Sequence, residues 1–297
     1  MQFTKKSLNQ MKDHGRNIGV YSKDLIEIIL KHSPKEFSDY SSRSYYFWLK
    51  KERPIPLNIV LKIIEDKKIK IEEISISGGN KIRVPKENAE FFYLLGLILG
   101  DGCISLSRKD SNRSTYVLKI ACRQEETAKK VQKIIERTFE CEAKIYPAKG
   151  CYSVDMYSKP LALLLNRFYD IPIGLKYKEI KVPKIIKRNN VKSIKSFLKG
   201  MHDSDGNIYN HRNNKAVQLR QKSERFLLEI RTLFIEIGIE FNKPYKDKAN
   251  NSWVLWSSKK EVVDKFIKEI IGFNPYGPVA QLGNGDNISL SGIPLSK

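Results

Sequence analysis

One stretch of the chain decides its fold, and it reads Leu94-Leu95-Gly96-Leu97-Ile98-Leu99-Gly100-Asp101-Gly102. It is apolar, it is long enough for a helix, and it runs directly into an alternating pattern typical of a strand. The same features return at Leu198-Lys199-Gly200-Met201-His202-Asp203-Ser204-Asp205-Gly206. Both copies carry small residues four positions apart, which share one helix face. Each segment therefore presents a strip almost free of side chains, and we expect the two helices to pack against each other through these strips.

An aspartate ends each segment, Asp101 in the first and Asp205 in the second. The last turn of a helix is already negative because its carbonyl oxygens are unpaired, so a carboxylate there needs a cation beside it. Two such ends packed together would gather carboxylates and carbonyl oxygens, the hard ligands that Mg²⁺ prefers. We expect Gly102 and Gly206 to end their helices in the left-handed conformation. A single Gly-Asp-Gly would indicate an ordinary helix-ending turn, whereas two copies in matching context favour a shared metal site.

At these residues the sequence resembles the LAGLIDADG homing endonucleases, specifically the single-chain kind that carries two motifs. The resemblance covers roughly residues 88–275, and the second motif is the closer match. It implies an α+β fold with two pseudo-symmetric αββαββα halves that pack through the motif helices. It also implies that Asp101 and Asp205 are the metal-binding catalytic acids, and that Gly100 and Ser204 offer main-chain carbonyls to the metals.

The charge of the chain indicates a polyanionic partner. The formal net charge is +21, from 54 Lys and Arg against 33 Asp and Glu, which exceeds what solubility requires. No segment has the length and purity of a transmembrane helix, so nucleic acid is favoured over a membrane. The four cysteines lack C-x₂-C spacing and follow no signal peptide, which predicts reduced thiols in an intracellular protein associated with nucleoid or organellar DNA.

Residues 1–75 predict a separate, small all-α domain, because apolar residues recur there with helical spacing in three runs. The order of a helix, a turn, a short helix and a further helix resembles a repressor-type helix-turn-helix, whose short helix lies in the major groove. The alternative is a small helical bundle with merely solvated basic residues. Residues 76–88 carry breaker residues and predict a linker that lets the domains reorient. The expected DNA contacts of this domain are Ser42, Arg43, Tyr45, Tyr46, Lys50 and Lys51.

The residues after each motif predict the same order of elements twice, in a first half over 89–180 and a second half over 181–274. Each half reads as two strands, a helix, two further strands and a helix, which indicates a duplication. A basic, saddle-shaped pair of sheets can lie along a DNA groove, where phosphate contacts set the register and strand side chains read bases. Residues 275–297 predict a poorly ordered tail. The expected contacts, each with a solvated sheet face as the alternative, are Arg113, Lys119, Tyr152, Arg212, Lys215, Gln218 and Arg220.

The two halves differ where the family has a strand-to-helix segment with a lysine near the metal. The resemblance assigns that lysine's role, positioning water and stabilising charge, to Lys222 with Gln221 beside it. In the first half it aligns Arg123 and Gln124 with Gln221 and Lys222, and we expect Arg123 to substitute as the basic residue. A guanidinium cannot deprotonate and has different hydrogen-bond geometry, so we expect unequal cutting of the two strands. His202 reads as a packed helix residue, and Asp203 reads as a structural group at the helix end.

The sequence therefore predicts a monomeric, site-specific endonuclease that uses Mg²⁺, or Mn²⁺ in its place, to hydrolyse both strands of double-stranded DNA. One alternative is a DNA-binding transcriptional regulator of the same fold that has lost catalysis, which the presence of both acids disfavours. Another is an RNA-binding maturase that acts on intron RNA. Met1 and Ser296-Lys297 lack the residues that protein splicing requires, so we expect a nuclease rather than an intein.

Overall fold

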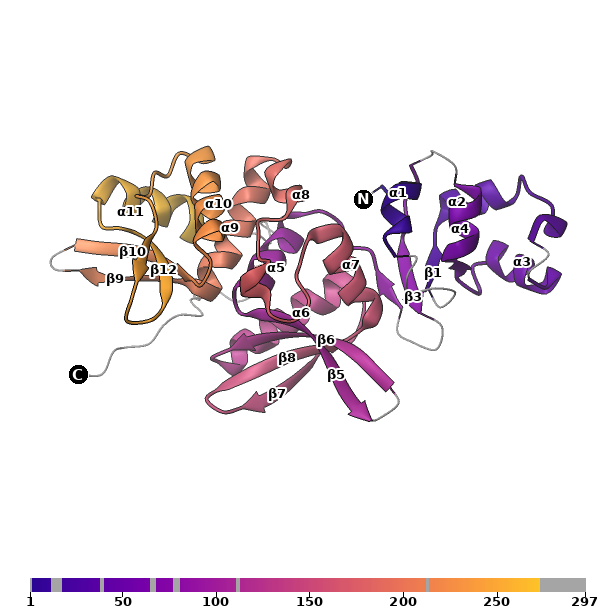
Figure 1. Cartoon of the computed structure of the whole chain (residues 1–297), viewed down its shortest axis with the longest axis horizontal. Helices are drawn as coiled ribbons and strands as arrows, with labels where there is room; N and C mark the ends of the chain where they lie inside the picture. Colours follow the sequence, from indigo (N-terminus) through magenta and orange to yellow (C-terminus); the bar gives the residue numbers. More distant parts are fainter. Residues whose placement is uncertain are drawn as a thin grey trace.

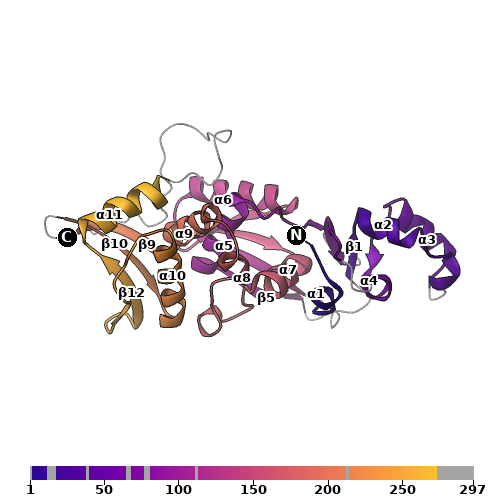
Figure 2. The ribbon, with the colours of Figure 1, turned by 90° about the horizontal axis from the view of Figure 1, so that it is seen from above.

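Three units of the chain lie in a row along the long axis of the molecule (Figure 1). The computed structural model describes residues 2–11, 18–37, 40–64, 68–76, 81–110, 113–211 and 214–272. The N-terminal unit stands at one end, the first half lies in the middle, and the second half stands at the other end, as the view from above also shows (Figure 2). The predicted tail, from residue 273 onward, lies outside the described residues.

Two helices, α5 (Ala89–Gly100) and α9 (Val191–Asp205), pack face to face between the two halves. A Cβ on Gly96 would lie 2.8 Å from the main-chain nitrogen of Met201, and one on Gly200 would lie 3.0 Å from that of Leu97. Such distances leave no room for a side chain, so the two backbones touch through the glycine strips. The predicted packing of the motif helices is therefore confirmed.

The ends of both helices are set by local hydrogen bonds and by close approach. Asn88 and Asn190 cap the N-termini, and each side-chain oxygen accepts a backbone N–H at 3.0 Å. The predicted left-handed ends are wrong: Gly206 is extended, with φ −97° and ψ 160°, and Gly102 has no positive φ either. A Cβ on Gly102 would lie 2.6 Å from the Cα of Ile98. Glycine is needed at position 102 because the backbone at the start of the following strand lies against the last turn of α5, which leaves no space for a side chain.

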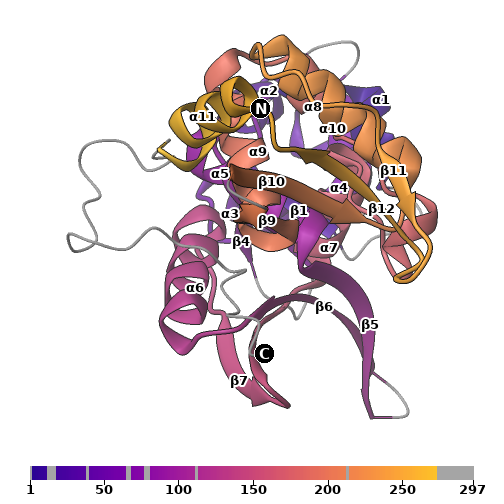
Figure 3. The same cartoon turned by 90° about the vertical axis from the view of Figure 1, so that its left-hand side faces the viewer.

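Each half carries a four-stranded antiparallel sheet, and the two sheets share one strand order. The first sheet has the order β5-β6-β8-β7, and the second has the matching order β9-β10-β12-β11. Seen from the end of the second half, the first sheet curves below the second (Figure 3). The strands are β5 (Gly102–Asp110), β6 (Arg113–Cys122), β7 (Lys144–Ala148), β8 (Cys151–Tyr157), β9 (Gly206–His211), β10 (Asn214–Gln221), β11 (Tyr245–Asp247) and β12 (Ser252–Ser257).

Helices cover one face of each sheet and leave the other face open. Buried side chains such as Leu118 and Ile120 alternate with the outward Lys119 on β6, as predicted. The predicted pair of pseudo-symmetric halves is therefore confirmed. The covering helices are α6 (Glu125–Phe139) and α7 (Lys159–Tyr169) in the first half, and α10 (Glu224–Glu236) and α11 (Lys260–Phe266) in the second, with a π-helical turn (Ile267–Ile271) after α11. A 3₁₀ helix (Lys176–Lys178) and α8 (Lys184–Lys187) connect the halves.

The strand register relates the two halves residue by residue. Cys122 pairs with Tyr152 in the first sheet, and Gln221 pairs with Trp253 in the second. Cys122 therefore occupies the position of Gln221.

This register corrects the sequence-based alignment of the halves by one residue. Arg123 corresponds to Lys222, so both halves carry a basic residue at that position. Gln124 is the N-cap residue of α6 and corresponds to Ser223, the N-cap residue of α10. The expected contrast between Lys222 and Gln124 is therefore wrong, and the contrast lies between Gln221 and Cys122.

The N-terminal unit is small and rich in short helices, but it also contains a sheet. The all-α prediction missed this four-stranded antiparallel sheet, of order β2-β1-β3-β4, because each strand is too short to show an alternating pattern. The helices are α1 (Lys5–Asn9), α2 (Lys23–Ile29), a 3₁₀ helix (Pro34–Phe37), α3 (Ser42–Leu49) and α4 (Leu57–Ile63). The strands are β1 (Ile18–Tyr21), β2 (Ile55–Pro56), β3 (Glu73–Ile76) and β4 (Ile82–Arg83).

The N-terminal unit packs directly on the first half. The buried ring of Phe3 meets the ring of Phe168 on α7 edge to face, with centroids 4.9 Å apart. Arg83 forms an ion pair with Glu140 at the end of α6. Part of the predicted linker, at β4, is an edge strand of the N-terminal sheet, and residues 77–80 lie outside the described residues. These contacts hold the two units together, contrary to the expected freedom to reorient.

Candidate functional site

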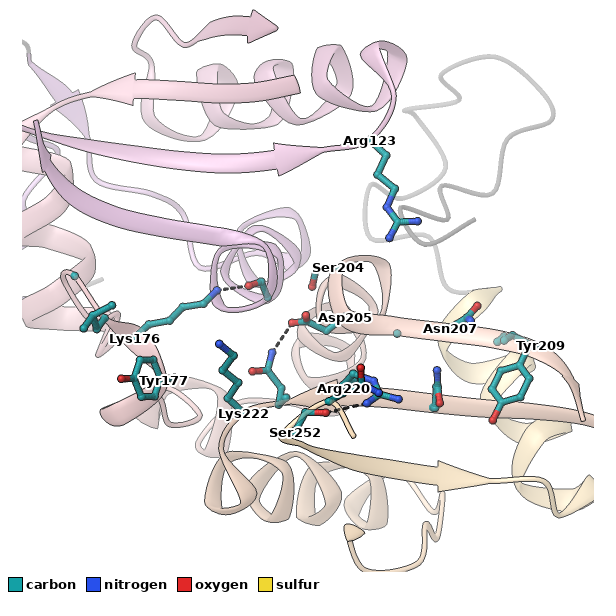
Figure 4. Close-up of a pocket in the computed structure, with 18 of the residues that line it drawn as sticks. Arg123, Lys176, Tyr177, Ser204, Asp205, Asn207, Tyr209, Arg220, Lys222 and Ser252 are labelled. Carbon is teal, nitrogen blue, oxygen red and sulfur yellow. Dashed lines mark hydrogen bonds between the residues drawn. The ribbon is translucent and has the colours of Figure 1, made fainter. Parts of the chain in front are cut away.

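An open cleft of about 1450 Å³ lies at the C-terminal ends of α5 and α9 and is lined by residues of both halves (Figure 4). Asp205 lies at its floor, and basic side chains reach it from several elements. Arg123 extends from the end of β6 on one side, while Arg220 and Lys222 lie on the opposite side (Figure 4). The cleft therefore surrounds a carboxylate with positive charge.

The two motif aspartates lie within electrostatic reach of each other. Asp205 is half-buried, and its Oδ2 lies only 2.8 Å from where a Cβ on Gly100 would stand. Burial raises the pKa of Asp205 to about 7, and the negative charge of Asp101 acts in the same direction. Asp101 reaches the solvent, yet the protein packed around its carboxyl raises the pKa to about 6. Ionising both groups is therefore costly unless a cation joins them.

Lys176 supplies one such cation, and the sequence analysis did not identify it. Its ammonium donates to the carbonyl oxygens of Gly100 and, at 2.8 Å, of Gly102, so it caps the end of α5. Burial lowers the pKa of Lys176, while the charges of Asp205 and Asp101 oppose this shift. The loop before Lys176 is anchored on β5 by a 2.8 Å hydrogen bond from the Gly174 N–H to the Ile104 carbonyl. No local pattern distinguishes this lysine from the others, because only the fold brings it to the motif.

Gln221 orients the second carboxylate. Its side-chain amide donates to Oδ2 of Asp205, which opposes the rise of the pKa of that carboxyl. In the first half the corresponding residue, Cys122, is buried. Burial raises the pKa of its thiol to about 12, and the negative charge of Asp101 contributes in the same direction. A neutral thiol is a weak donor, so Asp101 lacks an equivalent of the amide.

The donor atoms at this site suit a hard divalent cation. Asp101, Asp205 and the main-chain carbonyls of Gly100 and Ser204 are all oxygen donors, which Mg²⁺ prefers. Among the residues that the structure describes, no three His, Cys, Asp or Glu side chains gather into a cluster. A metal here would therefore depend on the two carboxylates, on carbonyls and on other oxygens. The position of the Lys176 ammonium on the Gly100 carbonyl indicates that this volume attracts positive charge.

The other predicted residues near the acids take different positions around the cleft. Lys222 is exposed, and its ammonium lies 5.9 Å from the centre of the Tyr177 ring. Arg123 is exposed on the facing side of the cleft. The charge of Lys176 lowers the pKa of Asp101, and the charge of Arg123 lowers it by a smaller amount. Gln124 begins α6 and does not line the cleft, so it is not brought together with the other candidates.

Alternation along the strands divides the predicted DNA contacts between two faces. Gln218 and Arg220 line the cleft, and Lys119 is on the open face of β6. Two other predictions need correction: Tyr152 packs against the hydrophobic core, and Lys215 is exposed on the face that carries Val217. Both follow from the period of two along a strand. The side chain of Arg113 and the whole of Arg212 lie outside the described residues.

Helix α3 presents most of its predicted contacts to solvent. Its exposed residues are Ser42, Arg43 and Tyr46, followed by Lys50 and Lys51 just after the helix. Tyr45 is an error of prediction, because its side chain is buried and its hydroxyl donates to the carbonyls of Ile29 and His32.

His202 and Asp203 stabilise the helix pair. Asp203 is buried and accepts hydrogen bonds from the Lys199 ammonium at 2.7 Å and the Tyr93 hydroxyl of α5 at 3.0 Å. His202 packs on the ring of Phe266 with centroids 5.2 Å apart. Both residues are therefore part of the packing beneath the cleft, as their sequence positions indicated.

Two segments of the chain, residues 88–168 and 192–271, match the family model described as a LAGLIDADG-like domain. Together the matches cover more than half of the chain and coincide with the two halves. Within the described residues, no helix has the length and apolar character to cross a membrane.

Several curated archaeal proteins each match a large part of this chain over one segment of their own sequence. An elongation factor 2 from Methanopyrus kandleri is 23% identical over 238 residues, which are 77% of this chain and 17% of that protein. A probable translation initiation factor IF-2 from Methanocaldococcus jannaschii is 25% identical over 247 residues, which are 77% of this chain and 20% of that protein. The chain thus spans about a fifth of these relatives. The two relatives have different names, and each resembles this chain only over its matched segment.

Solved structures show the same fold. The structure of I-DmoI in complex with DNA and Mn has a TM-score of 0.50 and 21% identity, and the match covers 64% of this chain and 99% of that one. Mesophilic variants of the homing endonuclease I-DmoI give a TM-score of 0.51 and 19% identity, covering 63% and 98% of the two chains. The two halves therefore have the arrangement of a single-chain homing endonuclease.

Proposed function

The chain belongs to the LAGLIDADG-like family, and on this premise we propose that it is a site-specific endonuclease that hydrolyses one phosphodiester on each strand of a DNA duplex. The observation that carries the proposal is the placement of Asp101 and Asp205 at the ends of two packed helices, where their charges interact and where Asp205 lines a cleft together with basic residues. Structural packing alone gives no reason to keep two coupled carboxyls in surroundings that raise the pKa of both. A catalytic cation gives such a reason, because it would neutralise both carboxylates.

The residues that would hold the metal are Asp101 and Asp205, with the carbonyls of Gly100 and Ser204. When bound there, Mg²⁺ or Mn²⁺ supplies a Lewis acid that activates water and neutralises charge on the phosphate. Gln221 fixes the orientation of Asp205 through its amide hydrogen bond.

The basic residues around the acids would act on the phosphate and on the proton balance of the site. Lys176 lowers the cost of ionising both acids. Lys222 and Arg123 lie on opposite sides of the cleft, so each would face one strand of a duplex bound in it. Of these, only a lysine is able to exchange its proton, because an arginine stays protonated.

The experiment that tests this function uses purified protein, Mg²⁺ and a plasmid library with randomised inserts. We expect linear plasmid in the presence of Mg²⁺, no cutting in EDTA, and cut ends that share one sequence when they are sequenced. Selective binding of one duplex without cutting would instead indicate a regulator. Selective binding of a structured intron RNA, with no duplex selected, would indicate a maturase.

We also propose that the N-terminal unit extends the bound DNA site. The exposed face of α3 combines Arg43, Tyr46 and the following Lys50. The guanidinium carbons of Arg43 and Arg53 lie 5.4 Å and 4.5 Å from the centre of the Phe47 ring. A ring that contacts two guanidinium groups helps to orient both of them. The double variant Arg43→Ala, Lys50→Ala should lower the salt slope of DNA binding by about 0.9 for each lost phosphate contact. An unchanged slope and footprint would show that this face does not touch DNA.

A further inference from the structure

Arg220, on the open face of the second sheet, is held in one orientation. Its Nη1 donates to a carboxylate oxygen of Asp247 at 2.5 Å and to the hydroxyl of Ser252 at 2.8 Å. Asn250 donates to the same carboxylate at 2.8 Å. These bonds come from the hairpin between β11 and β12, and they hold the side chain of Arg220 at the wall of the cleft that it lines (Figure 4). The side chain is therefore positioned before any ligand arrives.

The held arginine keeps donors for a further partner. Both bonds use Nη1, and among the described residues no acceptor is bonded to Nη2 or Nε of Arg220. A guanidinium presents its donors as a planar fork, and that fork matches the O6 and N7 acceptors of guanine in the major groove. The same fork also matches two oxygens of a phosphate, but a phosphate contact depends more strongly on net positive charge. The Asp247 carboxylate removes part of that charge while it fixes the fork.

The first half has small residues at these positions. The strand register places Ala121 at the position of Arg220, and the hairpin pair Ala148 and Cys151 at the positions of Asp247 and Ser252. Ala121 and Ala148 are exposed, so no side chain replaces the held arginine.

The first half holds a different cation instead. The Lys119 ammonium lies 3.1 Å from the buried carboxylate of Asp155, which also accepts a hydrogen bond from the hydroxyl of Ser153. Lys119 pairs with Asp155 in the first sheet, as Gln218 pairs with Trp256 in the second. Lys119 therefore occupies the position of Gln218, two residues farther from the motif helices than the position of Arg220.

We infer that Arg220 and Lys119 each specify a guanine, one in each half of the DNA target, and that the two guanines lie at unequal distances from the centre of the site. Two residues along a strand span about 6.6 Å, and this corresponds to roughly two base pairs of B-DNA. The guanine read by Lys119 therefore lies about two base pairs farther out than the one read by Arg220. This inference rests on the proposed function and adds the bases that the cleft selects.

The test is a binding selection on a pool of duplexes with a randomised central region, in Ca²⁺, followed by mapping of the cut centre in Mg²⁺. The proteins are wild type, Arg220→Ala, Arg220→Lys and Lys119→Ala, with Arg225→Ala as the matched control, because Arg225 is 86% exposed on the helical side. Arg220→Ala should relax one guanine about tenfold to a hundredfold and leave the other positions unchanged. Arg220→Lys should retain overall affinity and only part of this preference, because an ammonium lacks the planar fork of the guanidinium. Arg225→Ala should change nothing.

Asp247→Asn separates the orientation of Arg220 by Asp247 from the recognition of the guanine by Arg220. Arginine stays in place in this variant but loses its carboxylate, so the same guanine should be relaxed more weakly than in Arg220→Ala. Lys119→Ala should relax a different guanine, in the other half and about two base pairs farther out.

Three results would overturn the inference: Arg220→Ala weakening all sequences equally, no position depending on Arg220, or the two guanines lying at equal distances from the centre. If wild type selects no sequence at all, the proposed function fails with it. If wild type selects and cuts one site but that site is insensitive to Arg220 and Lys119, the inference alone fails.

Discussion

The second half orients Asp205 through the amide of Gln221, whereas the first half places the buried thiol of Cys122 at the same position near Asp101. The backbone frame around both is the same, down to strand order and register. The frame is shared because the glycine strips of α5 and α9 leave no room for another packing. The difference teaches that this packing fixes where the carboxylates stand, while single side chains decide how each one is supported.

A second difference is Lys176, which belongs to the connection after the first half. Among the described residues, no lysine donates in the same way to the carbonyl oxygens of Ser204 and Gly206 at the end of α9. The first half therefore supplies a buried cation, and the second half supplies an amide. We expect these unlike supports to separate the two cleavage events.

The largest expected effect comes from removing either acid. Asp101→Asn and Asp205→Asn should each abolish double-strand cleavage, by about a thousandfold or more, since we propose that the acids hold the metal. DNA binding should stay within about tenfold of wild type, because few phosphate contacts are lost. Cleavage is measured on a plasmid with the target, and binding by gel shift. Double-strand cutting retained in both variants would show that the motifs are not the site.

Lys176→Met should slow cleavage by about a hundredfold, a loss comparable to that of one charge-stabilising donor. The acids then lose a cation that opposes the rise of their pKa values, so the pH at which cleavage is half-maximal should also move upward. A merely structural role would lower the rate at every pH by the same factor. Lys184→Met, exposed on α8 outside the cleft, serves as the control and should have little effect.

A smaller effect concerns stability and compares the two acids directly. Asp205→Asn should raise the melting temperature at pH 8 by a few degrees. The pKa of Asp205 is about 7 in the folded protein, and an unfolded aspartate has a pKa near 3.9. Its ionised form therefore destabilises the fold fully above pH 7, and this destabilisation fades as the pH falls toward about 4.

The gain from Asp205→Asn should accordingly shrink as the pH is lowered from 8 to about 4. Asp101→Asn should give a smaller gain that begins to fade near pH 6, because its pKa is raised less. Thermal unfolding followed by circular dichroism over this range measures both. A gain that grows as the pH falls would contradict the assigned shifts.

Much of the fold was predictable from the sequence because its signals are local and repeated. The two glycine strips, the alternating strands after each Asp-Gly and the paired order of elements all follow from helix and strand periods. The N-terminal sheet was missed because strands such as Ile55–Pro56 contain only two residues, which show no period.

The candidate site was predictable only in part. Asp101, Asp205 and Gln221 stand in recognisable sequence contexts, whereas Lys176 reaches the site through a loop anchored on β5. The pairing of Arg220 with Asp247 is equally non-local, since the two residues lie on neighbouring hairpins. Tyr45 and Tyr152 were misplaced because a tyrosine suits a core and a DNA surface equally well. Only the register and the burial distinguish these cases.

The most direct measurement of the central claim, that unlike residues support the two acids, is the rate of cutting on each strand of a supercoiled plasmid that carries the target. A difference in barrier of about 1.4 kcal/mol gives about a tenfold difference in rate, so wild type should accumulate a nicked form before the linear one. Gln221→Cys should slow mainly one strand and reduce the difference, and Cys122→Gln should speed the other. If no nicked form appears with wild type, or if Gln221→Cys slows both strands equally, the two acids are supported alike and the account is wrong.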